Sequence, residues 1–581
     1  MVEEYEGTMT RGVYLIGFSG SGKSTIARLV GARLRCPAYD LDEVIVERSG
    51  MTIPIIFARE GEPGFRAREA EALRAVSNSG TFVVAAGGGT PVRPENRLFM
   101  AEKGWIICLE GRPETLLARI QQQLKDSDPS AVRPMLDAVY PLDQVRALKH
   151  SRQSVYALAD WTVHTDRLTP QQVADEIVHA VDLLEKAPPA ILDAPVMPMR
   201  HTLSPDLPPP IVVASGPWPY QAVVGWDHLP ALGGQIHRLL PRARRVAVIT
   251  DAGTWGRLGG SLRDSLQAAG LELHVREVLP DERAKTPEEA GAAYDWLLDM
   301  PLRRDDIILV AGAGAIDDLG GFVASTYMRG VPLVKVPTSL EGMVDSSIGG
   351  KTALNHPRAR NLIGTFFHPR LAWCDAHLLR DEPPRELRAA WAEVVKYAML
   401  ESSLLRDQVM GSMFFDQLEQ HADELIGLEQ STLLSVIARC AALKAQVVAG
   451  DERDSGQYRI LLNYGHTVGH ALETATNYDL VHGEAVAIGM AVEARLAVRL
   501  GLADAAVAAR QNHLLARFGL QTWLPPVSRD QLLEFINHDK KVFGDAPRWI
   551  LPVAIGRAVV SGNVAEADLT AALDECGSPG P

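Results

Sequence analysis

A glycine-rich segment near the N-terminus is the feature that most constrains this chain. It reads Gly17-Phe18-Ser19-Gly20-Ser21-Gly22-Lys23-Ser24-Thr25, follows a short apolar run and opens a helix-like stretch. In that strand-to-helix context the pattern predicts a phosphate-binding loop, whose backbone N–H groups and following helix favour an anion. The sequence therefore predicts an ATP site in which Lys23 reaches the terminal phosphates and Ser24 ligates Mg²⁺. The residues of this predicted cofactor site are Gly20, Ser21, Gly22, Lys23, Ser24 and Thr25.

The surrounding residues alternate strand-like and helix-like stretches. Residues 12–18, 83–86 and 105–109 are apolar strand candidates, and Lys23–Leu34 is a helix candidate. This rhythm is typical of a parallel sheet with helices on both faces. We expect an α/β domain over residues 1–185.

Acidic and basic side chains after these strands indicate a small anionic acceptor. Asp40 and Asp42 follow a second predicted strand, and strand alternation would place them on one face. One can serve Mg²⁺ while the other binds an acceptor hydroxyl. Arginines can grip a carboxylate bidentately, and a glycine triplet lets backbone approach a small ligand. Those candidates are Arg66, Gly88 in the triplet Gly87–Gly89, Arg133 and Arg152.

The amino-acid composition of the sequence changes after the first domain. Prolines recur from residue 188 to 219 with little periodicity, which predicts an extended linker over residues 186–212. Buried-strand candidates at 246–250, 307–311 and 333–336 then alternate with helical segments, and from about residue 385 the sequence is rich in Ala, Leu and Glu. We expect a second α/β domain over 213–384 and an α-helical domain over 385–581.

A histidine cluster in the last domain predicts a metal centre. His466 and His470 are four residues apart, so a helix would present both on one face, and His482 follows sixteen residues after His466. Imidazoles at such spacing, with an acidic side chain as the third ligand, suit a catalytic zinc site with an open position. Glu393 is the acidic candidate.

The second α/β domain offers weaker signals for a dinucleotide. Asp251 follows one predicted strand and can accept ribose hydroxyls. Gly312 and Gly314 follow another strand, but Gly-x-Gly without a third glycine is not a dinucleotide fingerprint.

Bulk properties narrow the function classes. The 581 residues carry a formal charge of −14, which argues against general nucleic-acid binding. No run of 18 uncharged apolar residues occurs, so we expect no membrane span. The five cysteines form no Cys-x-x-Cys pair, which favours a reducing, cytoplasmic setting over a disulfide framework.

The N-terminal motifs, taken in order, resemble shikimate kinase. GFSGSGKST, DLD, GEPGFR, GGG, Arg133-Pro134 and Arg152-x3-Tyr156 carry the resemblance, which covers residues 11 to about 180. It implies that Asp40 and Ser24 serve Mg²⁺, that Arg133 is a lid arginine, and that Arg119 lies near adenine. It also implies a set of shikimate contacts: Asp42, Arg66, Gly88 and Arg152. The segment between Arg119 and Arg133 is longer than the family pattern, which predicts an extended lid.

The C-terminal motifs resemble 3-dehydroquinate synthase from about residue 215 to 560. VDSSIGGKT (344–352), YMRG (327–330), NLIG (361–364), Glu393-x2-Lys396-Tyr397, LNYGHTVGH and HGEAVAIGM carry the resemblance. It implies NAD and zinc, with cobalt as a possible substitute, and the metal ligands Glu393, His466 and His482. Expected NAD contacts are Asp251, Glu282, Lys285, Gly312, Gly314, Asp318, Thr338 and Ser339. Expected substrate or catalytic residues are Asp345, Lys351, Arg360, Asn361, Lys396, Lys444, Arg459, Asn463, His470 and Lys541, with Arg329 reaching over from a neighbouring subunit.

Departures from the synthase pattern cluster near the expected NAD site. Ala313 adds a methyl where backbone should approach the pyrophosphate, and Asp317 adds negative charge. Ser339, Glu341 and Arg360 replace the usual threonine, apolar residue and lysine. Because the implied metal and substrate residues are all present, we expect an active synthase with weakened NAD affinity.

Three readings of the whole chain remain. The leading one is a bifunctional kinase and synthase acting on small molecules, dimeric through its synthase half. In the second, the kinase is fused to a related sugar-phosphate cyclase or a metal-dependent alcohol dehydrogenase. In the third, the C-terminal half is a non-catalytic dimerisation scaffold.

Overall fold

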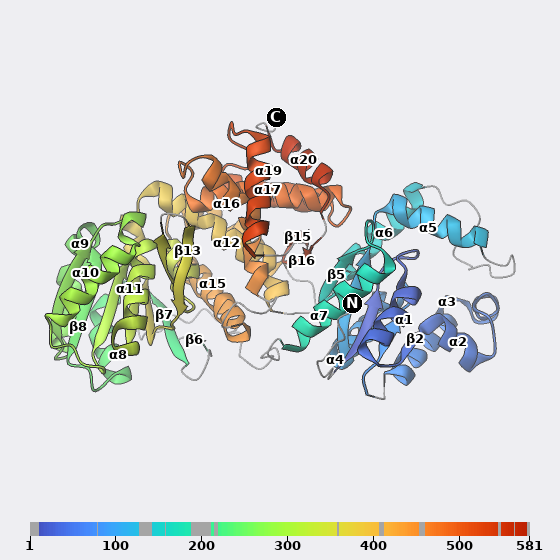
Figure 1. Ribbon diagram of the computed structural model, residues 1–581, viewed down its shortest axis with the longest axis horizontal. Helices are drawn as coiled ribbons and strands as arrows, with labels where there is room; N and C mark the ends of the chain where they lie inside the picture. The colour runs from blue at the N-terminus through green and yellow to red at the C-terminus, as the bar shows by residue number, and fades with distance from the viewer. Residues whose placement is uncertain are drawn as a thin grey trace.

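The computed structural model contains two α/β sheets and a helical region (Figure 1). The structure describes residues 11–77, 80–126, 142–156, 159–186, 211–213, 219–356, 359–405, 412–451, 459–543, 548–562 and 564–577. Most of the predicted linker therefore lies outside the described residues.

The first sheet has five parallel strands in the order β2-β3-β1-β4-β5. Apart from β2 its strands are buried along their whole length, as strands covered by helices on both faces must be. The strands are β1 (Gly12–Ile16), β2 (Ala38–Asp40), β3 (Val83–Ala85), β4 (Gly104–Glu110) and β5 (Trp161–His164). The helices are α1 (Lys23–Leu34), α2 (Leu41–Ser49), α3 (Ile53–Val76), α4 (Pro94–Lys103), α5 (Pro113–Asp126), α6 (Leu142–Tyr156) and α7 (Pro170–Lys186).

The segment around Asp40 differs from the expected strand alternation. Asp40 ends β2 and caps α2, accepting a hydrogen bond from the Asp42 N–H at 2.9 Å. A short polar side chain at an N-cap satisfies a helix donor that would otherwise lack a partner. The expectation that Asp40 and Asp42 share a face by strand alternation was wrong, because a strand-to-helix turn separates them.

The second sheet has seven strands in the order β6-β7-β14-β11-β10-β8-β9, and only β6 is antiparallel to its neighbour. Its strands are β6 (Ile211–Val213), β7 (Tyr220–Gly225), β8 (Arg245–Asp251), β9 (Glu272–Val278), β10 (Ile307–Gly312), β11 (Leu333–Pro337) and β14 (Leu371–Asp375). Its helices are α8 (Leu232–Leu239), α9 (Ala252–Ala268), α10 (Pro287–Leu298) and α11 (Ala315–Thr326), and a hairpin of β12 (Lys351–His356) and β13 (Ala359–Phe366) follows.

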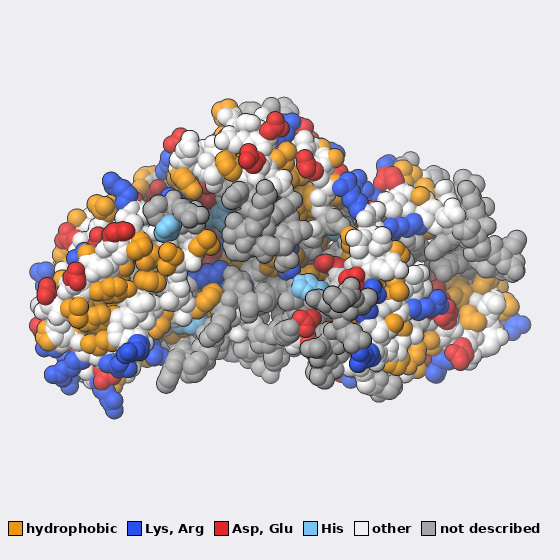
Figure 2. Space-filling model, viewed as in Figure 1, with side chains coloured by type: hydrophobic (Ala, Val, Ile, Leu, Met, Phe, Trp, Pro, Cys, Tyr) orange, Lys and Arg blue, Asp and Glu red, His pale blue; other side chains and the backbone are white. Residues whose placement is uncertain are grey.

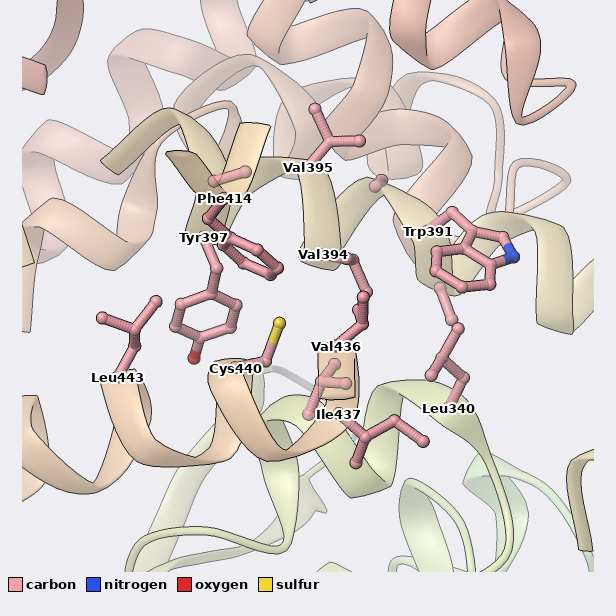
Figure 3. Packing of buried hydrophobic residues seen from close by; sticks show 14 of the residues in the cluster. Leu340, Trp391, Val394, Val395, Tyr397, Phe414, Val436, Ile437, Cys440 and Leu443 are labelled. Atoms are coloured by element: carbon pink, nitrogen blue, oxygen red, sulfur yellow. The ribbon is translucent and has the colours of Figure 1, made fainter. Parts of the chain in front are cut away.

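The last region is helical around two long buried helices. Figure 3 shows Trp391 and Val394 of α12 near Val436, Ile437 and Cys440 of α15, with Leu340 of the preceding domain beside them. The helices are α12 (Pro384–Leu404), α13 (Met413–Gln420), α14 (Ala422–Ile426), α15 (Gln430–Gly450), α16 (His466–Ala475), α17 (His482–Arg499), α18 (Ala505–Arg517), α19 (Arg529–Phe543) and α20 (Glu566–Glu575). A hairpin that the sequence reading did not anticipate, β15 (Trp549–Ala554) and β16 (Arg557–Ser561), packs among them.

Helix α15 is long and apolar enough, by length and composition, to cross a membrane. It is the one such helix among the described residues. More than half of its apolar window is buried inside the protein, and Val436, Ile437 and Cys440 belong to the core. These contacts are those of a central core helix, and core helices of folded proteins commonly share this length and apolar composition.

Candidate active sites

The glycine-rich loop connects β1 to α1 and lines a hollow at the edge of the first sheet. Gly17, Gly20 and Gly22 all have positive φ, which lets the loop turn its backbone inward. Lys23 Nζ donates to the carbonyls of Gly17 and Phe18 at 2.9 Å, so it folds back over the loop. The hollow is lined by Ser19, Gly20, Gly22, Lys23, Ser24, Thr25, Asp40, Asp42, Ala85, Ala86, Gly87 and Gly88. Both predicted Mg²⁺ residues and Asp42 therefore share one hollow with the loop.

Arg66 is held at the acceptor side by a buried carboxylate. Its Nη1 lies 2.9 Å from Glu69 Oε2, and the Glu69 side chain is 1% exposed. The other Glu69 oxygen accepts a hydrogen bond from Thr90 Oγ1 at 2.7 Å. Burial disfavours the charge of Arg66, but Glu69 and Glu62 raise its pKa above the usual value. Glu69 was not predicted, although it follows Arg66 by three residues on α3.

The glycine triplet brings the remaining acceptor candidates together. The Tyr156 hydroxyl donates to the Gly88 carbonyl at 2.7 Å. A Cβ at Gly88 would lie 3.5 Å from Arg152 Nη1, and one at Gly89 would collide with the Arg66 guanidinium. Arg66, Gly88 and Arg152 are therefore neighbours.

Of the two arginines expected near the nucleotide, the structure describes only Arg119. Arg119 lies on α5 and donates to the side chain and carbonyl of Thr165, which follows β5. Arg133 lies outside the described residues, so its expected role as a lid arginine stays a prediction.

In the second sheet, three expected NAD residues lie at the carboxyl ends of adjacent parallel strands. Asp251 ends β8, Gly312 ends β10 and Thr338 follows β11. Thr338 N donates to the Gly312 carbonyl at 3.2 Å, and Asp251 Oδ1 caps α9 by accepting from Thr254 N. Gly314 has φ 46° just before α11, and Ser339 Oγ accepts from Gly342 N at 3.1 Å. This edge of an open α/β sheet is where ligands usually bind.

A small polar network lies beside this edge. Lys285 Nζ lies 2.5 Å from Asp318 Oδ2 and donates to Asn361 Oδ1 at 2.5 Å. Glu282 Oε2 accepts from Asn355 Nδ2. The network joins three of the expected NAD contacts (Glu282, Lys285 and Asp318) to Asn361, which was expected to touch substrate.

Asp317 is neutralised rather than left facing the glycine turn. Its Oδ2 lies 2.7 Å from Lys335 Nζ of β11, and the two side chains are 11% and 1% exposed. The acidic departure thus has a dedicated counter-ion inside the sheet. The charge that was expected to weaken NAD binding is balanced within the protein.

The predicted metal ligands meet at one point. His466 begins α16, His482 begins α17 and Glu393 lies on α12, and one ligand atom of each lies within 4.8 Å of the others. Glu393 Oε1 is 3.5 Å from His466 Nε2 and 3.7 Å from His482 Nε2. Both oxygens of Glu393 are buried without a hydrogen bond of ordinary geometry among the described residues. Such a set of atoms fits a cation.

Outer groups orient the two imidazoles. His466 Nδ1 is 3.1 Å from the Tyr464 carbonyl, and His482 Nδ1 is 3.3 Å from Glu473 Oε1. These contacts leave each Nε2 turned toward Glu393, as carboxylate and carbonyl partners do for metal-bound histidines. Glu473 was not predicted, although it follows His470 by three residues on α16.

The electrostatics of the trio also favour a cation. Burial lowers the pKa of His466 well below its usual value, and Lys396 adds to the effect. Burial opposes charge on His482 too, but Glu393 and Glu473 raise its pKa to about 10. Without a metal, positive charge is therefore placed on His482 between two carboxylates. A bound cation would take the place of that proton.

Asp345 lies between two lysines of the helical region. Lys396 Nζ is 3.3 Å from Asp345 Oδ2 and also contacts Glu393, while Lys444 Nζ contacts Asp345 Oδ1. Burial lowers the pKa of Lys444, and Asp345 opposes that effect. Asp345 belongs to the second α/β domain and both lysines to the helical region, so the chain of charges crosses the boundary between them.

The other expected substrate residues differ in how closely they approach Asp345 and its two lysines, and in how exposed they are. Arg459 is buried against the VDSSIGGKT loop, because a Cβ at Gly349 would lie 3.3 Å from Arg459 Nη2. The His470 ring centroid is 5.4 Å from that of His466. Lys351 and Asn463 are exposed. The Arg360 guanidinium lies 3.8 Å above the Tyr478 ring, and Arg329 is exposed with φ 65°. The Lys541 side chain lies outside what the structure describes.

Both halves of the chain match known enzyme families. The shikimate kinase family matches residues 19–182, and the N-terminal and C-terminal 3-dehydroquinate synthase families match residues 276–389 and 390–542. A 3-dehydroquinate synthase from Rippkaea orientalis is 37% identical over 347 residues, covering 59% of this chain and 92% of the relative. The chain belongs to the 3-dehydroquinate synthase family. Its N-terminal part adds a shikimate kinase domain, so the chain is a fusion of the two.

Further relatives agree with the synthase assignment. The 3-dehydroquinate synthase of Pelotomaculum thermopropionicum is 41% identical over 335 residues, covering 57% of this chain and 88% of that one. The solved 2-epi-5-epi-valiolone synthase of Streptomyces hygroscopicus is 28% identical with a TM-score of 0.55, covering 61% of this chain and 96% of its own. A solved 2-deoxy-scyllo-inosose synthase, 22% identical with a TM-score of 0.56, shares the fold and covers 63% of this chain and 100% of its own.

Proposed function

We propose that this chain catalyses two reactions of aromatic biosynthesis at separate sites. The first half transfers phosphate from ATP to shikimate. The second converts 3-deoxy-D-arabino-heptulosonate 7-phosphate to 3-dehydroquinate and phosphate. The observation that carries the synthase assignment is the convergence of Glu393, His466 and His482 beside Lys396 in a chain of the synthase family.

In the kinase half, catalysis rests on position and charge. The loop from Gly20 to Thr25 and the start of α1 hold the ATP phosphates, and Lys23 leaves its carbonyl partners to reach them. Ser24 and Asp40 hold Mg²⁺, and Asp42 binds the acceptor hydroxyl. Arg66 and Arg152 bind the acceptor carboxylate beside Gly88. Arg119 lies beside adenine, and Arg133 closes over the transferred group, as is typical of phosphoryl transfer.

The metal trio of the synthase half fits zinc, because it offers two neutral imidazole nitrogens and one carboxylate and leaves a position for substrate. When bound, the metal polarises the substrate hydroxyl that is transiently oxidised. Cobalt can occupy such a site, as in the 2-deoxy-scyllo-inosose synthase structure with Co²⁺. Glu473 and the Tyr464 carbonyl fix the imidazoles, and Lys396 holds Glu393 in its ionised form.

The edge of the second sheet fits NAD, which the 2-epi-5-epi-valiolone synthase structure contains together with Zn²⁺. The N-terminus of α11 after Gly314 suits the pyrophosphate, and Asp251 suits the ribose hydroxyls. NAD held there would supply reversible hydride transfer. The chain's own groups would hold it there. Gly312, Thr338 and Ser339 form the turns at the strand ends, and Glu282, Lys285 and Asp318 belong to the polar network beside them.

Cationic and polar side chains next to this region hold the phosphate and carboxylate of the substrate. Lys396 and Lys444 are anchored by Asp345, Arg459 packs on the loop that carries Asp345, and His470 adjoins the metal ligands. Asn463 and Lys351 offer exposed polar groups. Arg360, Asn361 and Lys541 complete this proposed set.

We further propose a cytoplasmic homodimer joined through the synthase half. Large hydrophobic side chains on η4 (Tyr327–Arg329) and β13 are exposed, namely Met328, Leu362, Ile363 and Phe366. Figure 2 shows hydrophobic side chains gathered on one face of the α/β part of the synthase half. Arg329 lies next to Met328 and is exposed, so it can reach a second copy. The proposed units are the kinase over 1–185, the linker over 186–212, the NAD domain over 213–384 and the metal domain over 385–581.

The test measures both activities in one sample. We expect ADP-coupled phosphorylation of shikimate, and phosphate release with dehydroquinate formation that needs NAD and is abolished by a chelator. Lys23→Met should remove only the kinase activity and Glu393→Gln only the synthase activity, so each variant is the control for the other. Failure of the heptulosonate phosphate to turn over, with kinase activity intact, would contradict the synthase assignment.

A further inference from the structure

The two halves contact each other at a surface that belongs to neither site. In Figure 1, β5 and α6 of the kinase half lie beside β15 and β16 of the synthase half. We call this surface the seam. It consists of Glu110, Arg112, Lys149, Trp161 and His179 on the kinase side, and of Gly501, Arg548 and Asp568 on the synthase side.

A buried lysine of the kinase half lies in the seam. Lys149 Nζ is 2.8 Å from Glu110 Oε2, and the two side chains are 2% and 3% exposed. The same ammonium donates to the carbonyl of Gly501, in the turn between α17 and α18, at 3.3 Å. Buried ion pairs need further hydrogen bonds to offset the cost of leaving water. One of those bonds comes from the other half of the chain.

Asp568 provides a second charged contact across the seam. It lies in the first turn of α20, where only a small part of it is exposed, and its carboxylate pairs with Arg112 of the kinase half. In a third contact across the seam, the Arg548 guanidinium lies 6.0 Å from the Trp161 ring centroid and 3.4 Å from His179 Nε2. The seam therefore combines one ion pair and one hydrogen bond from a lysine ammonium with an arginine over an aromatic ring.

Hydrogen bonds within the kinase half hold the kinase side of the seam in place. Glu110 ends β4, and its carbonyl accepts from Thr165 Oγ1 at 2.9 Å. The Arg112 N–H donates to Asp166 Oδ1 at 2.9 Å. Thr165, which accepts hydrogen bonds from Arg119, is thus also bonded to the end of β4. A surface whose groups are already ordered loses little conformational entropy on docking.

We infer that the kinase and synthase halves of this chain dock onto each other through the seam, held by Arg112–Asp568 and by Lys149 on the Gly501 carbonyl. The partner of this kinase surface is the other half of the same polypeptide. Neither proposed reaction needs this docking, so the inference stands apart from the proposed function.

The test is small-angle X-ray scattering, at low salt, of the intact wild-type chain and four variants. Asp568→Arg and, separately, Arg112→Glu place like charges across the seam and should increase the radius of gyration. The combined Arg112→Glu, Asp568→Arg chain restores an opposite pair and should return to the wild-type scattering curve. Glu43→Arg is the matched control, because Glu43 forms an exposed ion pair with Arg28 between α1 and α2, away from the seam. It should leave the curve unchanged.

Both enzyme activities are measured on each form to exclude unfolding. Active single variants with enlarged dimensions, together with recovery in the combined variant, would support docking. Active single variants whose scattering matches the wild type would overturn it. Loss of activity in Asp568→Arg alone leaves Arg112→Glu to decide, because that change lies on the opposite half.

Discussion

Asp317 of α11 and Lys335 of β11 form a buried ion pair with an N–O distance of 2.7 Å. The pair places a compensating charge directly behind the glycine turn of the proposed NAD site. It explains how a synthase of this kind carries an acidic residue there.

Removing one partner of this pair should be costly. Lys335→Met leaves the Asp317 carboxylate buried and unpaired, so we expect the free energy of unfolding to fall by about 3–5 kcal/mol and the Kd for NAD to rise. The double variant Lys335→Met, Asp317→Leu should recover most of the stability. Denaturant unfolding and calorimetric titration with NAD measure the two effects. Equal stability of both variants would contradict the role of the pair.

Glu473 should control metal affinity without being a ligand. Glu473→Ala removes the carboxylate that orients His482, and we expect zinc affinity to fall by about 10- to 100-fold, with synthase activity falling in parallel. Competition with a chromophoric chelator measures the affinity. Glu484→Gln is the control, because Glu484 lies on the same helix as His482 but pairs with the half-exposed Arg385 of α12. An unchanged zinc affinity in Glu473→Ala would remove this carboxylate from the site.

Two glutamates that share Arg66 should differ in their effect on the kinase. Glu69 is 1% exposed and Glu62 is 55% exposed. We expect Glu69→Gln to raise the KM for shikimate by about tenfold, since a buried charge-assisted bond is lost, and Glu62→Gln to change it by less than about twofold. The KM for ATP should stay constant in both. Steady-state kinetics with each substrate varied in turn makes the comparison.

Glu382 should make stability depend on pH. Burial raises the pKa of Glu382 to about 8, although its Oε2 accepts from the Leu340 N–H at 3.0 Å. The folded state then binds more protons than the unfolded state between about pH 4.5 and 8, so stability falls as pH rises through that window. Glu382→Gln should therefore stabilise the protein at pH 9, by on the order of 1–3 kcal/mol, and have little effect at pH 4. Thermal melts at the two pH values test the sign.

The sequence predicted those parts of the structure that depend on local signals. Lys23–Leu34 was predicted residue for residue, because Gly-Lys-Ser opens a helix wherever the loop occurs. The set Glu393, His466 and His482 followed from the family motifs, whereas helical spacing alone paired His466 with His470. Glu69 and Glu473 were missed, since a carboxylate that holds a functional side chain from behind has no motif of its own.

Other features depend on tertiary contacts that no short pattern records. Asp317 was expected to be a liability for NAD, because its partner Lys335 lies eighteen residues away on a neighbouring strand. The hairpin of β15 and β16 was expected to be part of a helical region, because its two strands are short and, among the described residues, pair only with each other. Lys149 gave no signal, because the carbonyl it reaches is 352 residues away.

The bridge from Asp345 to Lys396 and Lys444 has a consequence for how the synthase half comes apart. Pulling the NAD domain away from the metal domain would leave the Asp345 carboxylate and the Lys444 ammonium without this partner, and each is costly to leave unpaired in a protein interior. We therefore expect the two domains to unfold together. Heating should show the synthase half as a single cooperative calorimetric peak, and a mutation in either of its domains should lower the melting temperature of both.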